Sequence, residues 1–287
     1  TEKRDLDIPA MVEVFDEEKI ARSAASNAYD VLQNTLGVNT QSQGFNGTGM
    51  STMTSKVMIR AVEKGTLVLV NGVPMNMDGK YNLEDIPAES IEKIEVVKGG
   101  GAVLYGSEAT GGVINIITKK TMANKIKIEA GNFGKERYSL SLGTKKFNII
   151  AGLENRGYAD QMSGVVGTPT AKSTCYDYGK GERKSILWNW SIADGLTFTN
   201  SYSKNEHQYW QKYFLSGVRS QNNYYEDTDN MFLLQYDKDG WKADLSYGTQ
   251  EKVYDQAKIS GGVVGKKSTY SSRKGHNTNF NLQKQID

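Results

Sequence analysis

A glycine-rich segment, GAVLYGS from Gly101 to Ser107, has the spacing of a loop that cradles phosphate groups. In such a loop a lysine follows the last glycine and reaches the phosphates of a bound nucleotide. Here Ser107 stands in that position. We therefore expect no nucleotide site, and we interpret the glycines as positions where the backbone turns sharply or approaches other backbone closely.

Residues for general acid and base catalysis are few. His207 and His276 are the only histidines of the sequence, and no grouping of serine, histidine and acid stands out. The single cysteine, Cys175, excludes an internal disulfide and is interpreted as an ordinary loop thiol. The sequence therefore predicts no enzymatic activity.

Methionines and aspartates are the remaining candidate metal ligands. Thioethers favour soft ions, which would suit a copper chelate, but methionine more often fills irregular gaps or contacts organic ligands, and we favour that interpretation. Aspartates suggest calcium, yet two of the four lie in an apparent turn, where aspartate is common anyway. We predict no metal site, and calcium in loops has no support. The methionines are Met50, Met53, Met58, Met75 and Met77; the aspartates are Asp227, Asp229, Asp237 and Asp239, the last two in the turn.

The composition excludes several classes of protein. Of 287 residues, 38% are hydrophobic, and the mean hydropathy is −0.56. No apolar run is long enough to cross hydrocarbon as a helix, so we interpret the chain as soluble or as a barrel. Its 35 basic and 33 acidic residues are interspersed and give a formal net charge of +2, which offers no electrostatic basis for binding nucleic acid. The 30 glycines, 4 prolines and 16 tyrosines favour strands and turns.

The N-terminal part predicts one compact domain of small mixed elements, of roughly 120 residues. A first strand is expected over 10–15. Asp16 can cap a helix that runs to Leu36 and ends before a glycine. The polar, glycine-punctuated stretch Gln41–Lys56 is expected to be a loop that leads into a strand over 57–60.

Further signals follow in the same domain. A β-rich run, LVLV, ends at Asn71-Gly72, a dipeptide that tolerates positive φ in a tight hairpin. Pro87 lies where a short helix can begin, since its fixed φ suits a first helical turn. Apolar strands are expected over 91–97 and 113–118.

After a division near 121–124, the sequence changes to long alternating strands with one consistently apolar face. A transmembrane barrel requires this alternation, because its strands face lipid on one side and the lumen on the other. Short turns such as Asp194-Gly195 alternate with long polar connections, the asymmetry of bacterial outer-membrane barrels. The strands include 147–154, 186–193, 196–203 and 241–248, and the long connections are 158–182, 207–227 and 253–271.

The stretch Leu67–Lys120 resembles the plug domain of TonB-dependent outer-membrane transporters. The resemblance implies a mixed α+β plug domain inside a transmembrane antiparallel β-barrel, with 1–122 as the plug and 123–287 as the N-terminal part of the barrel. About eight candidate strands follow the plug, whereas plugged transporters use about 22. We therefore expect either an incomplete chain or one piece of a split barrel completed by a second chain, because a last strand left alone would expose an unpaired edge in lipid.

Two basic positions match the family's plug motifs in part. Arg60 is followed by Ala61 where the family usually has Arg-Gly, and Lys98-Gly99-Gly100 stands where the family has Arg-Gly-Pro. The resemblance implies that Arg60 and Lys98 pair with acidic groups on the inner barrel wall and anchor the plug; ordinary solvated surface charge is the alternative. The TonB-binding segment is expected upstream of Thr1, so no residue is assigned to it.

The resemblance implies transport, not catalysis, in the bacterial outer membrane. A scarce ligand binds external loops and upper plug loops, and the TonB-ExbB-ExbD complex, powered by the proton-motive force, pulls on the plug to open a path. The plug loops expected to meet the ligand are Gln41–Lys56 and Met75–Asp85. The contact candidates within them are Gln43, Phe45, Met50, Met53, Met77 and Tyr81.

An iron chelate, meaning a siderophore or haem, is the expected cargo because it is the commonest cargo of the family, and cobalamin is the runner-up. His207 and His276 leave haem open. The other partner implied is outer-membrane lipid; no intrinsic cofactor and no nucleic acid are expected. Two alternatives of another class are a passive porin or adhesin barrel, against which the plug argues, and a soluble β-rich binding protein.

Overall fold

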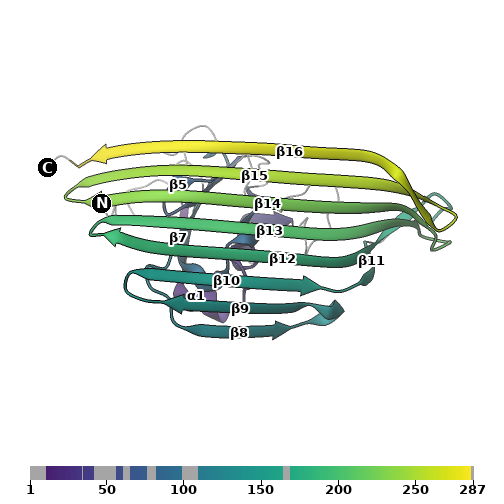
Figure 1. Ribbon diagram of the computed structural model, residues 1–287, viewed down its shortest axis with the longest axis horizontal. Coiled ribbons are helices and arrows are strands. Elements are labelled where there is room, and N and C mark those ends of the chain that lie inside the picture. The colour runs from purple at the N-terminus through teal and green to yellow at the C-terminus, as the bar shows by residue number, and fades with distance from the viewer. Residues whose placement is uncertain are drawn as a thin grey trace.

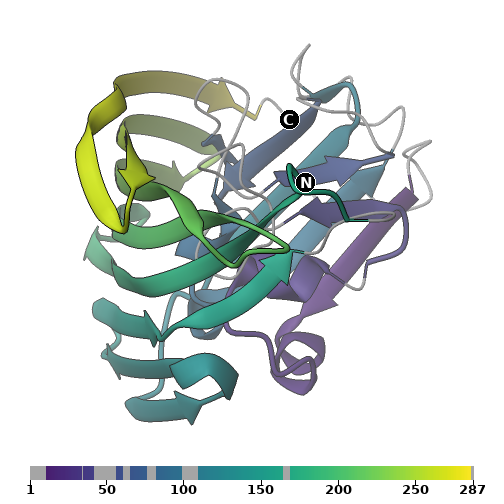
Figure 2. The same cartoon turned by 90° about the vertical axis from the view of Figure 1, so that its right-hand side faces the viewer.

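The protein consists of a small domain and a sheet of long strands (Figure 1). Turned by 90°, the sheet is seen to curve around one side of the small domain (Figure 2). This arrangement confirms the predicted plug against an antiparallel barrel wall. The computed structural model describes residues 11–33, 35–41, 56–60, 65–75, 82–98, 109–163 and 169–285.

The plug is built on a five-stranded sheet in the order β1-β6-β7-β4-β5. β4 runs parallel to β7, and the other neighbours are antiparallel. The elements are β1 (Met11–Asp16), α1 (Glu17–Arg22), α2 (Ala28–Leu32), β2 (Val38–Gln41), β3 (Lys56–Ile59), β4 (Thr66–Val70), β5 (Val73–Pro74), the 3₁₀ helices η2 (Leu83–Asp85) and η3 (Ala88–Ser90), β6 (Ile91–Lys98) and β7 (Gly112–Thr118).

The predicted single helix from Asp16 to Leu36 is wrong in its length. Asp16 does cap a helix, since its side chain accepts a hydrogen bond from the Lys19 backbone N–H at 2.8 Å. That helix, α1, ends early, and Ala24 takes a positive φ of 52°. Asn27 then caps α2 by accepting from Asp30 N–H at 2.9 Å. The serines and asparagines of this stretch bond to nearby backbone, which competes with a continuous helix.

The hairpin and the apolar strands of the plug are confirmed. Asn71 and Gly72 have positive φ angles of 51° and 83° and turn β4 into β5. The strands expected over 91–97 and 113–118 are β6 and β7. Pro87 precedes a single turn of 3₁₀ helix, η3.

The core of the plug lies between its sheet and its helices. Ile94, Ile114 and Ile116 have no exposed surface there. Met231 and Leu233, which belong to the long strand β14, pack into the same cluster. Side chains of the wall therefore form part of the hydrophobic core of the plug.

The long sheet follows the order β16-β15-β14-β13-β12-β10-β9-β8, with the short β11 paired to β12 beside this path. Eight strands lie on the path, the number expected, and in the described residues β8 and β16 do not pair, so the sheet is not closed. The bounds are β8 (Lys125–Ala130), β9 (Glu136–Gly143), β10 (Phe147–Arg156), β11 (Ala159–Ser163), β12 (Thr174–Ala193), β13 (Leu196–Tyr213), β14 (Arg219–Lys238), β15 (Trp241–Ser260) and β16 (Val263–Lys284). The domain boundary drawn at 122/123 falls in the connection from β7 to β8.

The long loops predicted over 207–227 and 253–271 are wrong. β13 to β16 run through most of both segments as paired strands and turn only near 214–218 and 261–262. The ladder hydrogen bonds continue where the side chains on both faces become polar. An apolar alternation reveals only the part of a strand that has an apolar face, so the sequence underestimates the length of these strands.

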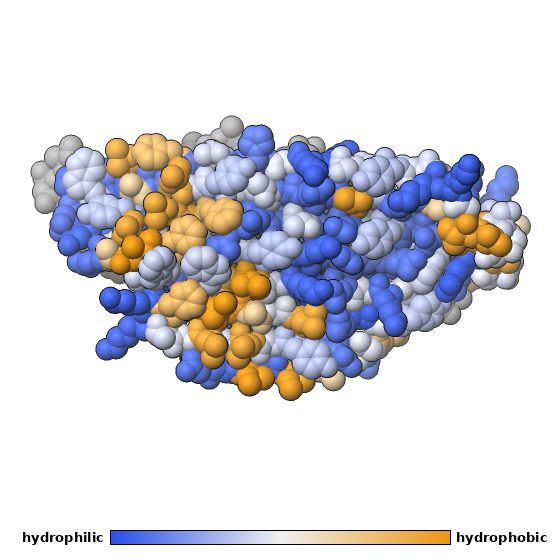
Figure 3. Space-filling model, in the orientation of Figure 1, coloured by the Kyte–Doolittle hydropathy of each residue, from blue (hydrophilic) through white to orange (hydrophobic). Residues whose placement is uncertain are grey.

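The outer face of the long sheet is apolar toward its short turns. Ile186, Trp190, Phe232 and Leu245 lie there and are 37–48% exposed. Figure 3 shows such side chains gathered over the half of the sheet nearer those turns, with hydrophilic ones over the other half. The inner face is polar, and its buried side chains include Asn189. Among the described residues, no helix has both the length and the apolar character needed to cross a membrane.

Gly112 gives a test of the packing of the plug. A Cβ at this position would lie 2.5 Å from Val97 O and 2.6 Å from Ile59 Cδ1. We expect Gly112→Ala to lower the free energy of unfolding by about 1–3 kcal/mol, measured by thermal unfolding in detergent. Gly131→Ala is the control, because its Cβ would meet only the Lys135 side chain at 3.5 Å or more. Equal stability of the two variants would contradict the packing described.

Candidate functional site

The plug segment from Asn82 to Ser90 lies against the inner wall. Asn82 caps the helix η2 by accepting from Glu84 N–H at 3.4 Å. Leu83 and Ile86 are each 1% exposed and fix the segment in the core of the plug. The acidic residues between them, Glu84 and Asp85, are buried as well.

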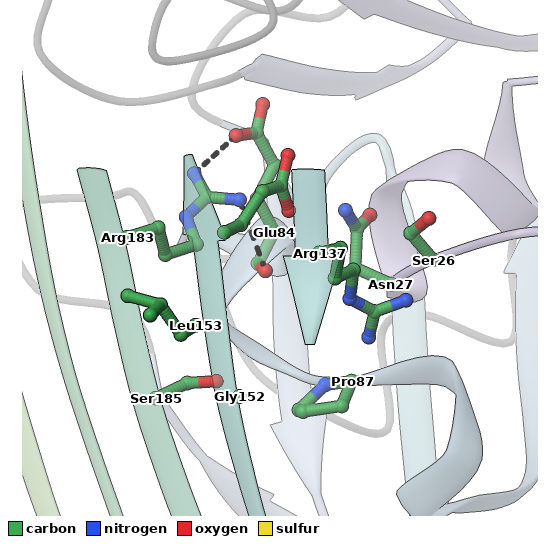
Figure 4. A pocket seen from close by; sticks show the side chains of 10 residues that line it. Ser26, Asn27, Glu84, Pro87, Arg137, Gly152, Leu153, Arg183 and Ser185 are labelled. Carbon is green, nitrogen blue, oxygen red and sulfur yellow. Dashed lines mark hydrogen bonds and ion pairs between the residues drawn. The ribbon is translucent and has the colours of Figure 1, made fainter. Parts of the chain in front are cut away.

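Arg183 joins the wall to this segment. It reaches from β12 to Glu84, as Figure 4 shows, and its Nη2 donates to Glu84 Oε2 while its Nη1 donates to Glu84 O at 3.3 Å. Its Nε donates to Asn205 on β13, and Asn205 Nδ2 donates to Asp85 Oδ1 at 3.1 Å. We call Arg183, Glu84, Asp85 and Asn205 the Arg183 cluster.

The Arg183 cluster is buried, and burial determines its energetics. The side chains of Arg183 and Glu84 are 5% and 0% exposed. Bringing both charges out of water is costly, but removing one partner costs about 3–5 kcal/mol, because the other is then buried and unpaired. Burial also raises the pKa of the Asp85 carboxyl, and Arg183 offsets this only in part. The plug and the wall are thus coupled by charge.

A second charged contact lies beside the first. Glu89 of the plug pairs with Arg137 of β9 at 3.0 Å and with Lys127 of β8 at 3.3 Å. Arg137 also pairs with Glu129 of β8 at 2.9 Å. A small cavity between the plug and the wall is lined by Glu84 and Arg183, and Figure 4 shows Arg137 and Asn27 at its edge. At both contacts the acid is on the plug and the base is on the wall.

Neutral contacts complete the interface. Amide side chains of the wall donate to backbone carbonyls of the plug and of the connection that follows it. Each such bond contributes about 0.5–1.5 kcal/mol net, since water can replace it. The pairs are Asn148 with Lys120 O at 2.6 Å, Asn189 with Lys119 O at 3.2 Å, Gln235 with Asn71 O at 3.0 Å and Asn279 with Pro74 O at 3.3 Å.

Of the two predicted anchoring residues, Lys98 contacts the plug itself. Lys98 Nζ pairs with Glu13 at 2.6 Å and also donates to Leu36 O, so its described partners belong to the plug. Arg60 is exposed and has a positive φ of 56°. Their pairing with an acidic barrel wall stays a prediction.

The six contact candidates predicted for the upper plug loops lie outside the described residues. They are Gln43, Phe45, Met50, Met53, Met77 and Tyr81. Of the other methionines considered, Met75 is buried in the core of the plug and Met58 is half-buried.

The two histidines lie apart. His207 is 7% exposed and stacks on Tyr225 with ring centroids 5.1 Å apart. His276 pairs with Thr249, which puts it on the same outer face of the sheet as Leu245. Neither imidazole is therefore freely exposed on the inner face of the wall.

The four aspartates that could suggest calcium lie in two different places. Asp237 and Asp239 lie at the turn from β14 to β15, while Asp227 and Asp229 lie within β14. In the part of the chain that the structure describes, no group of three or more acidic, histidine or cysteine side chains is placed to hold a metal ion.

The Arg183 cluster was not predicted, although two signals point to it. The segment NLEDIPAES is acidic, and Arg183 precedes Leu187 and Asn189 at the spacing of one strand face. The sequence does not show which wall strand meets the segment, because a contact across 99 residues depends on the curvature of the sheet.

Comparison with known proteins places these features in a family. Residues 4–113 match the model of the TonB-dependent Receptor Plug Domain. A vitamin B12 transporter, BtuB, of Vibrio vulnificus strain YJ016 is 28% identical over 92% of this chain and 43% of its own length. BtuB of strain CMCP6 is 31% identical over 69% of this chain and 32% of its own.

Solved structures agree in fold. The ferric enterobactin receptor PfeA of Pseudomonas aeruginosa superposes with a TM-score of 0.59 at 18% identity, over 94% of this chain and 45% of its own. The siderophore receptor PirA of Acinetobacter baumannii gives 0.57 at 20% identity, over 94% and 44%.

The chain is therefore a TonB-dependent receptor plug domain followed by part of the barrel. It spans less than half the length of the relatives just described.

Replacing Arg183 tests the charged contact. We expect Arg183→Met to lower the free energy of unfolding by about 3–5 kcal/mol, since Glu84 is left buried and unpaired. Combining it with Glu84→Gln should restore part of this loss, as a double-mutant cycle of thermal unfolding would show. Lys184→Gln is the control, because Lys184 is exposed and pairs with Glu182 on the outer face. Additive losses from Arg183→Met and Glu84→Gln would contradict the coupling.

Proposed function

We propose that the protein is an outer-membrane receptor that takes up a scarce metal chelate with energy supplied through TonB. The observation that carries this proposal is the Arg183 cluster, which holds a folded plug against a polar barrel wall. A plug held by buried charge does not leave its place spontaneously at a useful rate. Uptake then requires work on the plug, which a passive pore would not need.

The outer-membrane location is supported by the two faces of the sheet. In the half nearer its short turns the wall is apolar outside and polar inside, as a lipid-facing barrel requires. The central strand β14 pairs with a neighbouring strand on each side along most of its length, and such pairing is the condition for a strand to lie in hydrocarbon.

The plug has a mechanical link between its N-terminal elements and the Arg183 cluster. β1 is an edge strand of the plug sheet and pairs with β6. Farther along, Ala28 N–H donates to Ile86 O at 3.0 Å and Ala88 N–H donates to Ser26 O at 3.1 Å. A pull on the N-terminus would separate β1 from β6 and then act on the segment that carries Glu84 and Asp85.

The relatives and the solved structures support two kinds of chelate. The vitamin B12 transporters are 28–31% identical to this chain and favour cobalamin. The siderophore receptors share the fold at 18–20% identity. The histidines do not favour haem as the cargo, because His207 is buried and His276 lies on the outer face of the sheet. We therefore propose cobalamin or a ferric siderophore.

Growth of a deletion strain distinguishes these chelates. We expect loss of the receptor to abolish growth when cobalamin or a ferric siderophore is the limiting nutrient, and expression of the receptor with its complete barrel to restore it. The measurement is growth on each source alone, with and without TonB. No uptake defect on any source, or leakage of small solutes through the purified receptor in liposomes, would contradict active transport and favour a passive barrel.

A cross-link between plug and wall tests whether the plug must move. Gln235 Nε2 donates to Asn71 O at 3.0 Å, so cysteines at both positions are close enough for a short bifunctional cross-linker. We expect the cross-linked receptor to bind its chelate but to lose uptake, measured with a labelled chelate. The control joins two wall positions, Asp194 and Lys238, which form an ion pair at 3.0 Å. Normal uptake in the plug-to-wall variant would show that the plug stays in place during transport.

A further inference from the structure

Two carboxyl groups on the inner face of β14, Asp227 and Asp229, lie beside the Arg183 cluster. Each interacts electrostatically with Asp85 of the plug. Asp85, Asp229 and Ser203 line one small cavity between the plug and the wall. We call Asp227 and Asp229 the aspartate pair.

Few neighbouring groups donate a hydrogen bond to the aspartate pair. Asp227 is 4% exposed, and among the described residues no N–H group or hydroxyl donates to either of its oxygens, whose nearest polar neighbour is the Asp229 carboxyl. Lys252 Nζ lies 4.0 Å from Asp227 Oδ2, which is beyond hydrogen-bond distance. Asp229 Oδ1 accepts from Gln250 Nε2 at 2.6 Å, whereas Asp229 Oδ2 is buried with no such partner in the described part of the chain.

Ser203 adds a polar group to the same cavity, where it acts on Asp85. It belongs to β13, is 1% exposed, and its hydroxyl is buried with no hydrogen-bond partner in the described residues. Asp85 Oδ2 is in the same condition. Buried polar atoms are nearly always paired, so a proton bound among several such oxygens would be stabilised by the hydrogen bonds it can form there.

The charge balance also requires a proton. The charged groups that act on the pair or on Asp85 come from the plug and from two wall strands, and among these groups, the pair and Asp85 included, carboxyls outnumber cations by two. Each uncompensated buried charge costs several kcal/mol. Arg156 of β10 and His207 of β13 act on Glu84 and Arg183. The carboxyls are Glu84, Asp85, Asp227 and Asp229, and the cations are Arg183 and Lys252.

We propose that the aspartate pair binds a proton while the plug is docked. Two neighbouring carboxyls with so little solvation cannot both ionise, and a shared proton turns their repulsion into a hydrogen bond.

The bound proton links docking of the plug to pH. When the plug leaves, Asp85 departs and water reaches the pair, so both carboxyls ionise and the proton is released. The docked state therefore binds more protons than the undocked state, and its stability falls as the pH rises. The raised pKa of Asp85 acts in the same direction, since that carboxyl too holds its proton to higher pH when docked.

Infrared spectroscopy of the complete receptor in detergent tests the proton directly. We expect a carbonyl stretch of a protonated carboxyl at neutral pH that shifts in heavy water and is lost or displaced in Asp229→Asn. Asp227→Asn should have the same effect on this band and is the second variant, in case Asp229→Asn does not fold. A wild-type spectrum without a protonated carboxyl, or a band unchanged in both variants, would overturn the proposal.

The pH dependence of thermal unfolding provides the second test. We expect the unfolding midpoint of the wild-type receptor to fall from neutral to alkaline pH, and Asp229→Asn to lose most of that slope. Asp237→Asn is the control, because its side chain is 66% exposed at a turn, and it should keep the wild-type slope. The same slope in Asp229→Asn as in the wild type would show that the pair does not hold the proton. Neither test depends on which chelate is carried, or on transport itself.

Discussion

A buried ion pair between two parts of one chain, Arg183 of the wall and Glu84 of the plug, is the interaction on which the rest of the arrangement depends. Each charge is tolerated away from water only while the other is present. Arg183 of the wall therefore fixes the position of the plug, and Glu84 of the plug makes a buried arginine tolerable on the inner face of the wall. A plug displaced by a few ångströms would leave both charges desolvated, so intermediate positions are unfavourable.

The remaining contacts are of a different kind, and the difference suits the plug movement that we propose. Amides of the wall, such as Gln235 and Asn189, donate to carbonyls that water can satisfy equally well. Within the described ranges, a small apolar contact through Met231 and Leu233 joins the plug core to the wall. The interface thus combines buried charged contacts, which make displacement of the plug costly, with neutral hydrogen bonds that water can replace.

Much of the fold could be predicted from the sequence, because its signals are local. The Asn71-Gly72 hairpin, the cap at Asp16 and the alternation of Ile186, Trp188 and Trp190 each depend on residues close together in the chain. The predictions were wrong where local signals compete or vanish. The helix ended early because Asn27 caps a second one, and the polar ends of the long strands have no alternating pattern to reveal them.

The candidate site was harder to predict, because it is made by long-range contacts. The family pattern indicates the basic residues Arg60 and Lys98 as anchors, whereas the charged contacts observed between the described parts of plug and wall have acids on the plug, Glu84 and Glu89, and bases on the wall. Charge alone does not show which residue meets which wall strand, since that depends on the register and curvature of the whole sheet.

The most direct test of the central claim is to pull on the N-terminus of the plug in single receptors held in a membrane. The force needed for the first large extension should fall clearly in Arg183→Met relative to the wild type, and it should stay unchanged in Lys184→Gln. If Arg183→Met released its plug at the wild-type force, the buried ion pair could not be what holds the plug against the wall.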